Sequence, residues 1–158
     1  MPETGASEDF ALAREALRIA EELGDPALIA KAHHAMAAQF IQHGDPAEAI
    51  EPMKEALHRY TELDNRERIG RAQNSLALAY LLLGDYTSAA TFLRAGAETA
   101  GKVGDPVQIG LSRNNLGGLL TRLGDWDAAE TNLQEAARIF DRMDAAARLV
   151  HPLQNLAE

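Results

Sequence analysis

One dipeptide recurs along this chain at a fixed interval and constrains the fold more than any other feature. Gly-Asp stands at Gly24-Asp25, Gly44-Asp45, Gly84-Asp85, Gly104-Asp105 and Gly124-Asp125. The interval is 20 residues or a multiple of it, and Asp64-Asn65 and Asp144-Ala145 stand where the pair is missing. Glycine suits the left-handed position that ends a helix, and Asp accepts hydrogen bonds from the free amides that start the next one. Each interval is therefore predicted to hold one helix and its turn.

Two such helices form a unit of 40 residues, and side chains one unit apart match in size. Small residues share one register in the first helices (Ala37, Ala77, Gly117, Ala157) and another in the second helices (Ala16, Ala56, Gly96, Ala136). Large residues share further registers, such as Met36, Leu76, Leu116 and Leu156. Small residues recur where two helices approach closely, and large ones where a gap must be filled. Since no helix pair can bury both faces alone, we predict an all-α, right-handed superhelical solenoid of antiparallel helix pairs.

The expected organisation is a single domain, residues 1–158. It comprises a half-repeat (7–25), three repeats (26–65, 66–105 and 106–145) and a partial repeat (146–158), after a frayed leader over Met1–Ala6. The predicted helices are 8–23, 26–43, 46–62, 66–83, 86–102, 106–123 and 126–142. Because the pattern begins and ends halfway through a repeat, we expect a fragment of a longer protein. The alternative, that the ends pair with another copy, stays open.

Two stretches carry a family resemblance. They are Asn74-Ser75-Leu76-Ala77-Leu78-Ala79-Tyr80 with Leu83-Gly84-Asp85-Tyr86, and Asn114-Asn115-Leu116-Gly117 with Leu123-Gly124-Asp125-Trp126. The chain resembles the tetratricopeptide repeat (TPR) from about Ser7 to Glu158, in the 40-residue form seen in kinesin light chains and bacterial regulators. The resemblance implies a protein-binding role, with the first helix of each repeat lining a concave surface.

Composition and motif content exclude several classes of function. A net charge of −9 argues against a general nucleic-acid binder, and the absence of cysteine excludes disulfides and cysteine-based zinc sites. No apolar run approaches the roughly 20 residues of a membrane span, and no secretory signal opens the chain. We therefore expect a cytoplasmic protein without membrane partners. We expect no enzyme, metal or cofactor, since the sequence has no His-Glu-x-x-His pair, no phosphate-cradling glycine loop and no nucleophile beside a base.

The resemblance maps a concave stripe onto the first helices. Its candidate peptide-binding residues are Lys31, His34, Arg71, Asn74, Leu78, Leu81, Leu82, Asn114 and Arg122. The similarity to kinesin light chains implies that Asn74 and Asn114 bond the backbone of an extended peptide. The three leucines would form an apolar floor. Because the stripe carries three cations and no Asp or Glu, we expect an acidic ligand. The alternative, that these polar residues only face water, stays open.

Three classes of function follow from this surface. The first is a protein-interaction scaffold that binds a peptide or partner segment in the concave groove. The second is a ligand-sensing domain of a bacterial signalling protein, which a neighbouring ATPase, cyclase or DNA-binding domain in the full-length gene would favour. The third is a structural module that self-associates through its half-repeat ends, which light scattering across a concentration range would detect.

Overall fold

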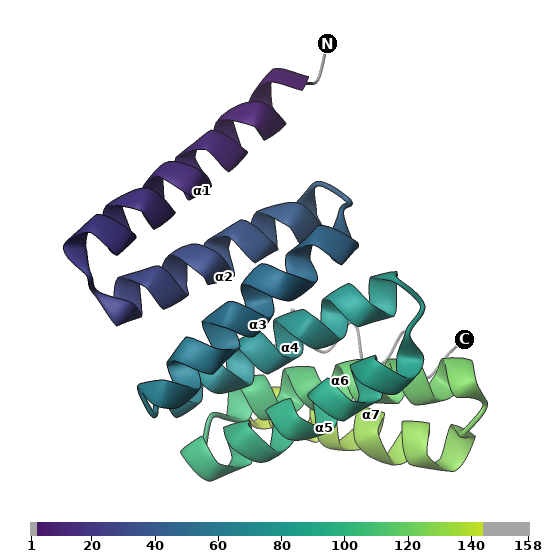
Figure 1. The fold of residues 1–158 in the computed structure, drawn as a ribbon. Coiled ribbons are helices and arrows are strands. Elements are labelled where there is room, and N and C mark those ends of the chain that lie inside the picture. Colours follow the sequence, from purple (N-terminus) through teal and green to yellow (C-terminus); the bar gives the residue numbers. More distant parts are fainter. Residues whose placement is uncertain (1–2, 144–158) are drawn as a thin grey trace.

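The computed structural model in Figure 1 describes residues 3–143 as a stack of seven helices, with no strand among them. The helices are α1 (Glu3–Leu23), α2 (Pro26–Gln42), α3 (Pro46–Glu62), α4 (Arg66–Leu82), α5 (Tyr86–Val103), α6 (Pro106–Leu123) and α7 (Trp126–Arg142). Each helix packs on the next one along the chain, and α1 and α7 lie at opposite ends of the stack. The molecule is therefore the all-α superhelical solenoid that the sequence predicts.

The helix bounds agree with the predicted ones within one residue from α2 to α7. The N-terminus differs, because α1 begins at Glu3 and the expected frayed leader is wrong from that residue on. The predicted partial repeat, 146–158, lies outside the described residues.

The turns have the conformation that the recurring pair predicts. All five glycines of the Gly-Asp pairs have φ between 64° and 86°, and Asp64 takes the same left-handed place with φ of 47°. The following Asp caps the next helix at four of five turns: Asp25, Asp85, Asp105 and Asp125. Asp45 does not, because the Glu48 amide donates to its backbone carbonyl instead. Asn65, which follows Asp64 at the turn without a Gly-Asp pair, caps α4.

The core is a ribbon that runs along the stack. One part joins α2, α3 and α4 around Met53, Tyr60 and Leu76, and the next joins α4 to α7 around Leu93 and Leu119. These five side chains are at most 2% exposed, so nearly all of their apolar surface stabilises the packing between helices. No single helix pair contains the whole core, as expected for a solenoid.

The two sets of helices differ in how closely they approach. The first helices of the repeats contact one another, α2 with α4 and α4 with α6, whereas α1, α3, α5 and α7 do not contact one another. The first helices therefore lie on the inside of the superhelix and form its concave face. The second helices lie on the outside and are separated by grooves.

Candidate functional site

A cavity of about 290 Å³ opens on the concave face between α4 and α6. Its α4 wall is apolar and consists of Leu78, Leu81 and Leu82. Its α6 wall is formed by Asn114, Asn115, Gly118, Leu119, Thr121 and Arg122. Five of the nine residues predicted for binding thus line one cavity. The leucines offer apolar surface to a ligand, since Leu78 is 43% and Leu82 56% exposed.

The cavity has a simple origin in the sequence. Gly118 occupies in α6 the register that Leu78 occupies in α4 and Ala38 in α2. Without a side chain at Gly118, nothing from α6 fills the space in front of the leucines. The concave face is therefore hollowed between the second and third repeats.

Asn114 supplies a hydrogen-bonding group inside the cavity. Its Oδ1 atom is buried and has no hydrogen-bond partner among the described residues. A buried acceptor without a partner costs free energy, which a ligand that donates an N–H or O–H would recover. The position of Asn114 suits the predicted contact with a peptide amide.

Asn74 is placed differently from Asn114. Its Nδ2 donates to Gln108 Oε1 at 3.0 Å, and its Oδ1 accepts from Ser112 Oγ at 2.8 Å. Gln108 and Ser112 both belong to α6, so Asn74 fixes α4 against the neighbouring repeat. These two bonds use one of the two N–H groups and one of the two lone pairs of the amide, so Asn74 has a structural role and its contact with a peptide stays a prediction.

The three predicted cations are not equivalent. Arg71 is ion-paired with Glu67, one turn earlier on the same helix, at 2.8 Å. Glu67 lies outside the predicted stripe but reaches its edge, so the positive field at Arg71 is weaker than expected. Lys31 and Arg122 make no ion pair among the described residues, and Arg122 lines the cavity. Lys31 is exposed on α2, away from the cavity lining.

His34 adds no positive charge to this face at pH 7. Burial lowers its pKa, and the nearby cations Arg68 and Arg71 lower it further. The ring lies 6.0 Å from that of Tyr60, between centroids, and its Nδ1 is buried without a partner. His34 is thus a half-buried packing residue at the edge of the concave face.

The predicted binding residues leave out four residues of the cavity lining, Asn115, Gly118, Leu119 and Thr121. All four belong to α6 and lie between Asn114 and Arg122, so the predicted set was too narrow on this helix. Within residues 3–143, no group of three or more His, Asp or Glu side chains could hold a metal ion. The described helices include none that is long and apolar enough to cross a membrane.

These features define a helical repeat protein whose concave face carries a partly apolar cavity. Residues 68–142 match the family model of the tetratricopeptide repeat. The repeats within these residues are of the tetratricopeptide type, as their motifs predict. A comparison with curated proteins finds no match.

Solved structures have the same fold. The crystal structure of BtubC (BKLC) from P. vanneervenii superposes with a TM-score of 0.82 at 24% identity, over 98% of this chain and 65% of that one. The crystal structure of Rap protein complexed with Competence and Sporulation Factor gives a TM-score of 0.77 at 20% identity, over 98% of this chain and 44% of that one. This chain thus spans less than two thirds of the length of either protein.

Proposed function

We propose that this chain is a protein-interaction module that binds an extended partner segment in its concave groove. The cavity between α4 and α6 carries the proposal, because it combines exposed leucines with a buried, unpartnered Asn114 oxygen. One apolar side chain of the partner would enter the cavity against Leu78 and Leu82. A neighbouring backbone amide of the partner would donate to Asn114.

The partner segment is proposed to be acidic, chiefly because of Arg122. This guanidinium lines the cavity and has no carboxylate partner among the described residues. An Arg–carboxylate pair is a strong, directional contact that would fix the ligand beside the apolar site. Lys31 would extend the positive surface along a longer ligand. Arg71 contributes less, because binding there competes with Glu67.

The experiment selects ligands first and then tests the site. Peptides are selected against the wild-type chain from a random displayed library, and their affinities are measured by fluorescence anisotropy. Leu82→Ala, Asn114→Ala and Arg122→Gln are each expected to weaken binding by about tenfold, since each removes a contact worth about 1 to 3 kcal/mol. Leu63→Ala is the matched control, because Leu63 is an exposed leucine that lies outside the cavity.

The outcomes separate the site from its charge preference. If all three variants bind like the wild type, the concave site is wrong and another surface must be searched. If only Arg122→Gln binds normally, or the selected peptides carry no excess of Asp and Glu, the acidic preference is wrong while the site stands. Salt should weaken wild-type binding more than that of Arg122→Gln.

A second proposal is self-association through α1, and an exposed apolar stripe supports it. Leu12, Ile19 and Leu23 are 69%, 44% and 66% exposed and follow one face of α1 together with Ala16. In α5 the same registers hold Phe92, Gly96, Thr99 and Val103. Phe92 stacks on Tyr80 of α4, and Thr99 donates to Gln73 of α4. The α1 stripe is thus the face with which a second helix packs on its first helix.

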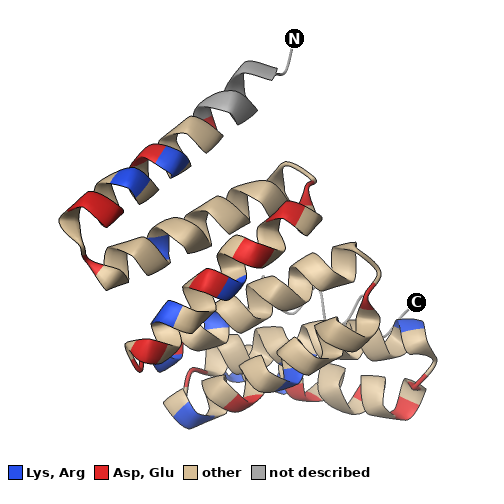
Figure 2. Cartoon of the chain, viewed as in Figure 1, with Lys and Arg blue, Asp and Glu red and all other residues tan. Residues whose placement is uncertain are grey.

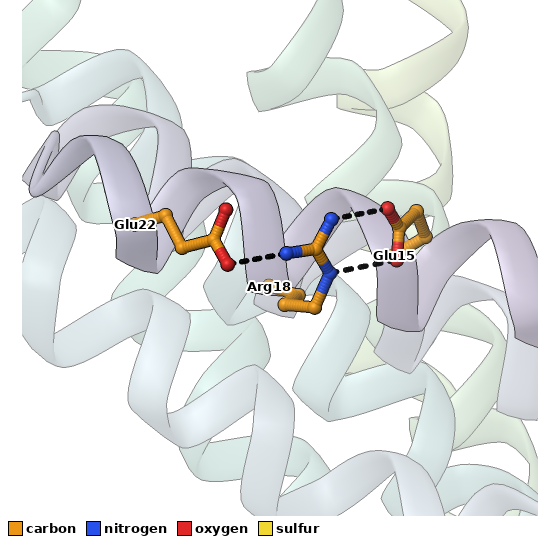
Figure 3. Close-up of polar contacts among 3 residues, drawn as sticks. All are labelled: Glu15, Arg18 and Glu22. Carbon is orange, nitrogen blue, oxygen red and sulfur yellow. Dashed lines mark hydrogen bonds and ion pairs between the residues drawn. The ribbon is translucent and has the colours of Figure 1, made fainter.

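Charged residues border the stripe on the side away from α2. Arg18 pairs with Glu15 at 2.6 Å and also with Glu22, which ties the three exposed side chains together (Figure 3). The pairing lowers the pKa of Glu15 and raises that of Arg18, so this pair is charged at neutral pH. An apolar strip with a charged rim resembles the layout of a protein interface.

The proposed occupant of the stripe is the first-helix sequence at 146–158 of a second copy, assigned by register. Such a head-to-tail contact does not close on itself, so the mass measured by light scattering should rise with concentration through multiples of the chain. Leu12→Glu with Leu23→Glu should abolish the rise, and Leu63→Glu should not. A wild-type chain that stays monomeric at high concentration would exclude this proposal.

A sensing role is also proposed, because the Rap protein of similar fold is seen in complex with Competence and Sporulation Factor. In this case the groove would hold a ligand and report occupancy to an effector domain. The full-length gene tests the idea: an ATPase, cyclase or DNA-binding domain beside the repeats would support it, and the absence of any further domain would count against it.

A further inference from the structure

The outer side of the first repeat has an open groove that the other repeats close. In the second repeat, Tyr80 of α4 stacks on Phe92 of α5, with ring centroids 5.7 Å apart and planes 7° from parallel. Close by, Thr99 Oγ1 donates to Gln73 Oε1 at 2.9 Å. Both contacts join the two helices of this repeat along their outer seam.

In the third repeat, polar and charged side chains join the two helices along the same seam. Arg113 of α6 donates to Asn132 of α7 at 3.2 Å and is ion-paired with Glu135 at 2.7 Å. Arg113 stands 40 residues after Gln73, and Asn132 stands 40 after Phe92. Different chemistry in equivalent positions therefore links the first and second helix of both repeats.

In the first repeat the equivalent positions leave the seam open. Pro52 stands where Phe92 stacks, and its small ring does not cover Phe40, the residue in the register of Tyr80. His33, in the register of Gln73, has a buried Nδ1 without a hydrogen-bond partner. A groove of about 580 Å³ results between α2 and α3, on the side of α2 away from the concave stripe. We call it the outer groove.

The outer groove combines an apolar floor with an acidic wall. Met36, Phe40 and Pro52 supply the apolar surface, and the carboxylates of Glu48, Glu51 and Glu55 follow one side of α3. No Lys or Arg belongs to its lining. Figure 2 shows the acidic residues gathered along α3 beside α2, whose one charged residue, Lys31, lies on the concave stripe.

The charges near the groove leave it net negative. Glu51 pairs with Lys54 at 3.1 Å, and Glu55 pairs with Arg59 at 2.7 Å. Glu48 has no ion pair among the described residues. Burial lowers the pKa of His33, so this ring is neutral at pH 7 and does not offset the carboxylates. Exposed ion pairs such as Lys54 with Glu51 contribute little, so a ligand cation can displace them at small cost.

We propose that the outer groove docks a basic amphipathic segment of a partner protein, a second interaction surface distinct from the concave one. The aliphatic stem of an Arg or Lys side chain would lie on Phe40 and Pro52, while its charged end meets Glu51 or Glu55. Apolar residues of the same segment would cover Met36. The net charge of the chain, −9, would attract such a partner, and the groove would position it.

The test uses a synthetic amphipathic peptide of leucine and arginine, with a glutamate-for-arginine peptide for comparison. Affinity is measured by fluorescence anisotropy at physiological salt. Glu48→Gln, Glu51→Gln and Glu55→Gln together should weaken binding about tenfold or more, because charged hydrogen bonds are lost. Asp127→Asn, Glu130→Gln and Asp141→Asn on α7 form the matched control, which removes the same charge elsewhere and should change affinity by less than about twofold.

A second variant tests the shape of the groove without changing its charge. Pro52→Phe introduces the side chain that closes the second repeat, and should also weaken binding about tenfold by covering Phe40. Far-UV circular dichroism checks that each variant is folded, and the triple glutamine variant decides the result if Pro52→Phe does not fold. Leu82→Ala, in the concave cavity, should leave this binding unchanged.

Three results would overturn the proposal. Equal losses in the two triple variants would show that the peptide only senses the net charge. Wild-type affinity in the folded Pro52→Phe variant would show that the groove is not the site. An equal loss in Leu82→Ala would place the basic peptide in the concave cavity instead.

Discussion

The first and third repeats solve the same packing problem with different residues. Where α2 meets α3, Ala37 faces Met53, and both are buried. Where α6 meets α7, Gly117 faces Leu133, and a Cβ placed on Gly117 would lie 2.6 Å from Leu133 Cγ and 3.2 Å from a backbone oxygen. The third repeat therefore packs its helices closer than an alanine allows, whereas the first repeat leaves room for a methyl group.

The same substitution pattern links packing to the candidate site. Gly110, Gly117 and Gly118 of α6 stand where α2 has alanine at 30, 37 and 38. A glycine inside a helix lowers stability by about 0.5 to 1 kcal/mol relative to alanine. Thus α6 gains close contact and an open concave cavity but depends on its neighbours for helicity, while α2 has the stronger intrinsic preference for helix.

The largest expected loss of stability comes from truncating the side chains that face Ala37 and Gly117, which are Met53 and Leu133. Leu133→Ala should lower the free energy of unfolding by about 2 to 5 kcal/mol, since the side chain is 1% exposed. Met53→Ala should cost less, because its surroundings lack such rigid backbone contacts and can relax further. Urea unfolding followed by circular dichroism measures both. A larger loss in Met53→Ala than in Leu133→Ala would contradict the proposed difference in packing between the first and third repeats.

A smaller loss of stability is expected from exchanging glycine and alanine at the equivalent positions 117 and 37. Gly117→Ala should destabilise by about 1 to 3 kcal/mol through overpacking. Ala37→Gly should cost about 1 kcal/mol through lost helix propensity. Adding Leu133→Ala to Gly117→Ala removes the clashing atoms, so the double variant should lose less than the sum of the two single losses. Strict additivity would mean that the glycine is not needed for close approach.

The sequence predicted the elements well because their signals are local. Glycine at a left-handed C′ position and Asp after it define each turn within a few residues, which is why the bounds of α2 to α7 agree within one residue. The clustering of Leu78, Leu82 and Asn114 was predictable too, since it follows from helical register and one family resemblance. The ion pair of Arg71 with Glu67 was within reach as well, because it has ordinary i, i+4 spacing.

What could not be predicted depends on contacts between repeats. Asn74 bonds to Gln108 and Ser112, which lie 34 and 38 residues away. Whether an asparagine faces a ligand or the next repeat depends on the rotation between repeats, and no local pattern encodes this angle. The outer groove is similar, since Pro52 creates it only in combination with the placement of Phe40 and His33.

A third prediction compares helix caps in the two repeats. Asp105 accepts from the Gln108 amide at 3.1 Å at the start of α6, whereas the Asp45 side chain makes no capping bond to α3. Asp105→Ala should therefore cost about 1 kcal/mol, and Asp45→Ala about 0.5 kcal/mol or less. The urea concentrations at which the two variants are half unfolded provide the test. Equal losses would show that the caps do not distinguish the repeats.

The smallest expected change is a gain in stability, at Gly70 of α4. This residue shares its register with Ala30 and Gly110. A Cβ at Gly70 would lie 3.6 Å from Thr99 Cγ2, an ordinary contact, whereas at Gly110 it would lie 2.7 Å from the Phe140 ring. The opposing residue explains the difference, because the register of Phe140 holds Ala100 in the second repeat.

Gly70→Ala should thus raise the free energy of unfolding by about 0.5 to 1 kcal/mol, since it adds helix propensity without a clash. Gly110→Ala is the matched control with the opposite sign, because the buried Phe140 has little room to move. If both substitutions stabilise the chain, α7 can shift away from α6, and the close approach in the third repeat is a preference rather than a requirement. If both destabilise it, the space at Gly70 is smaller than its 3.6 Å contact indicates.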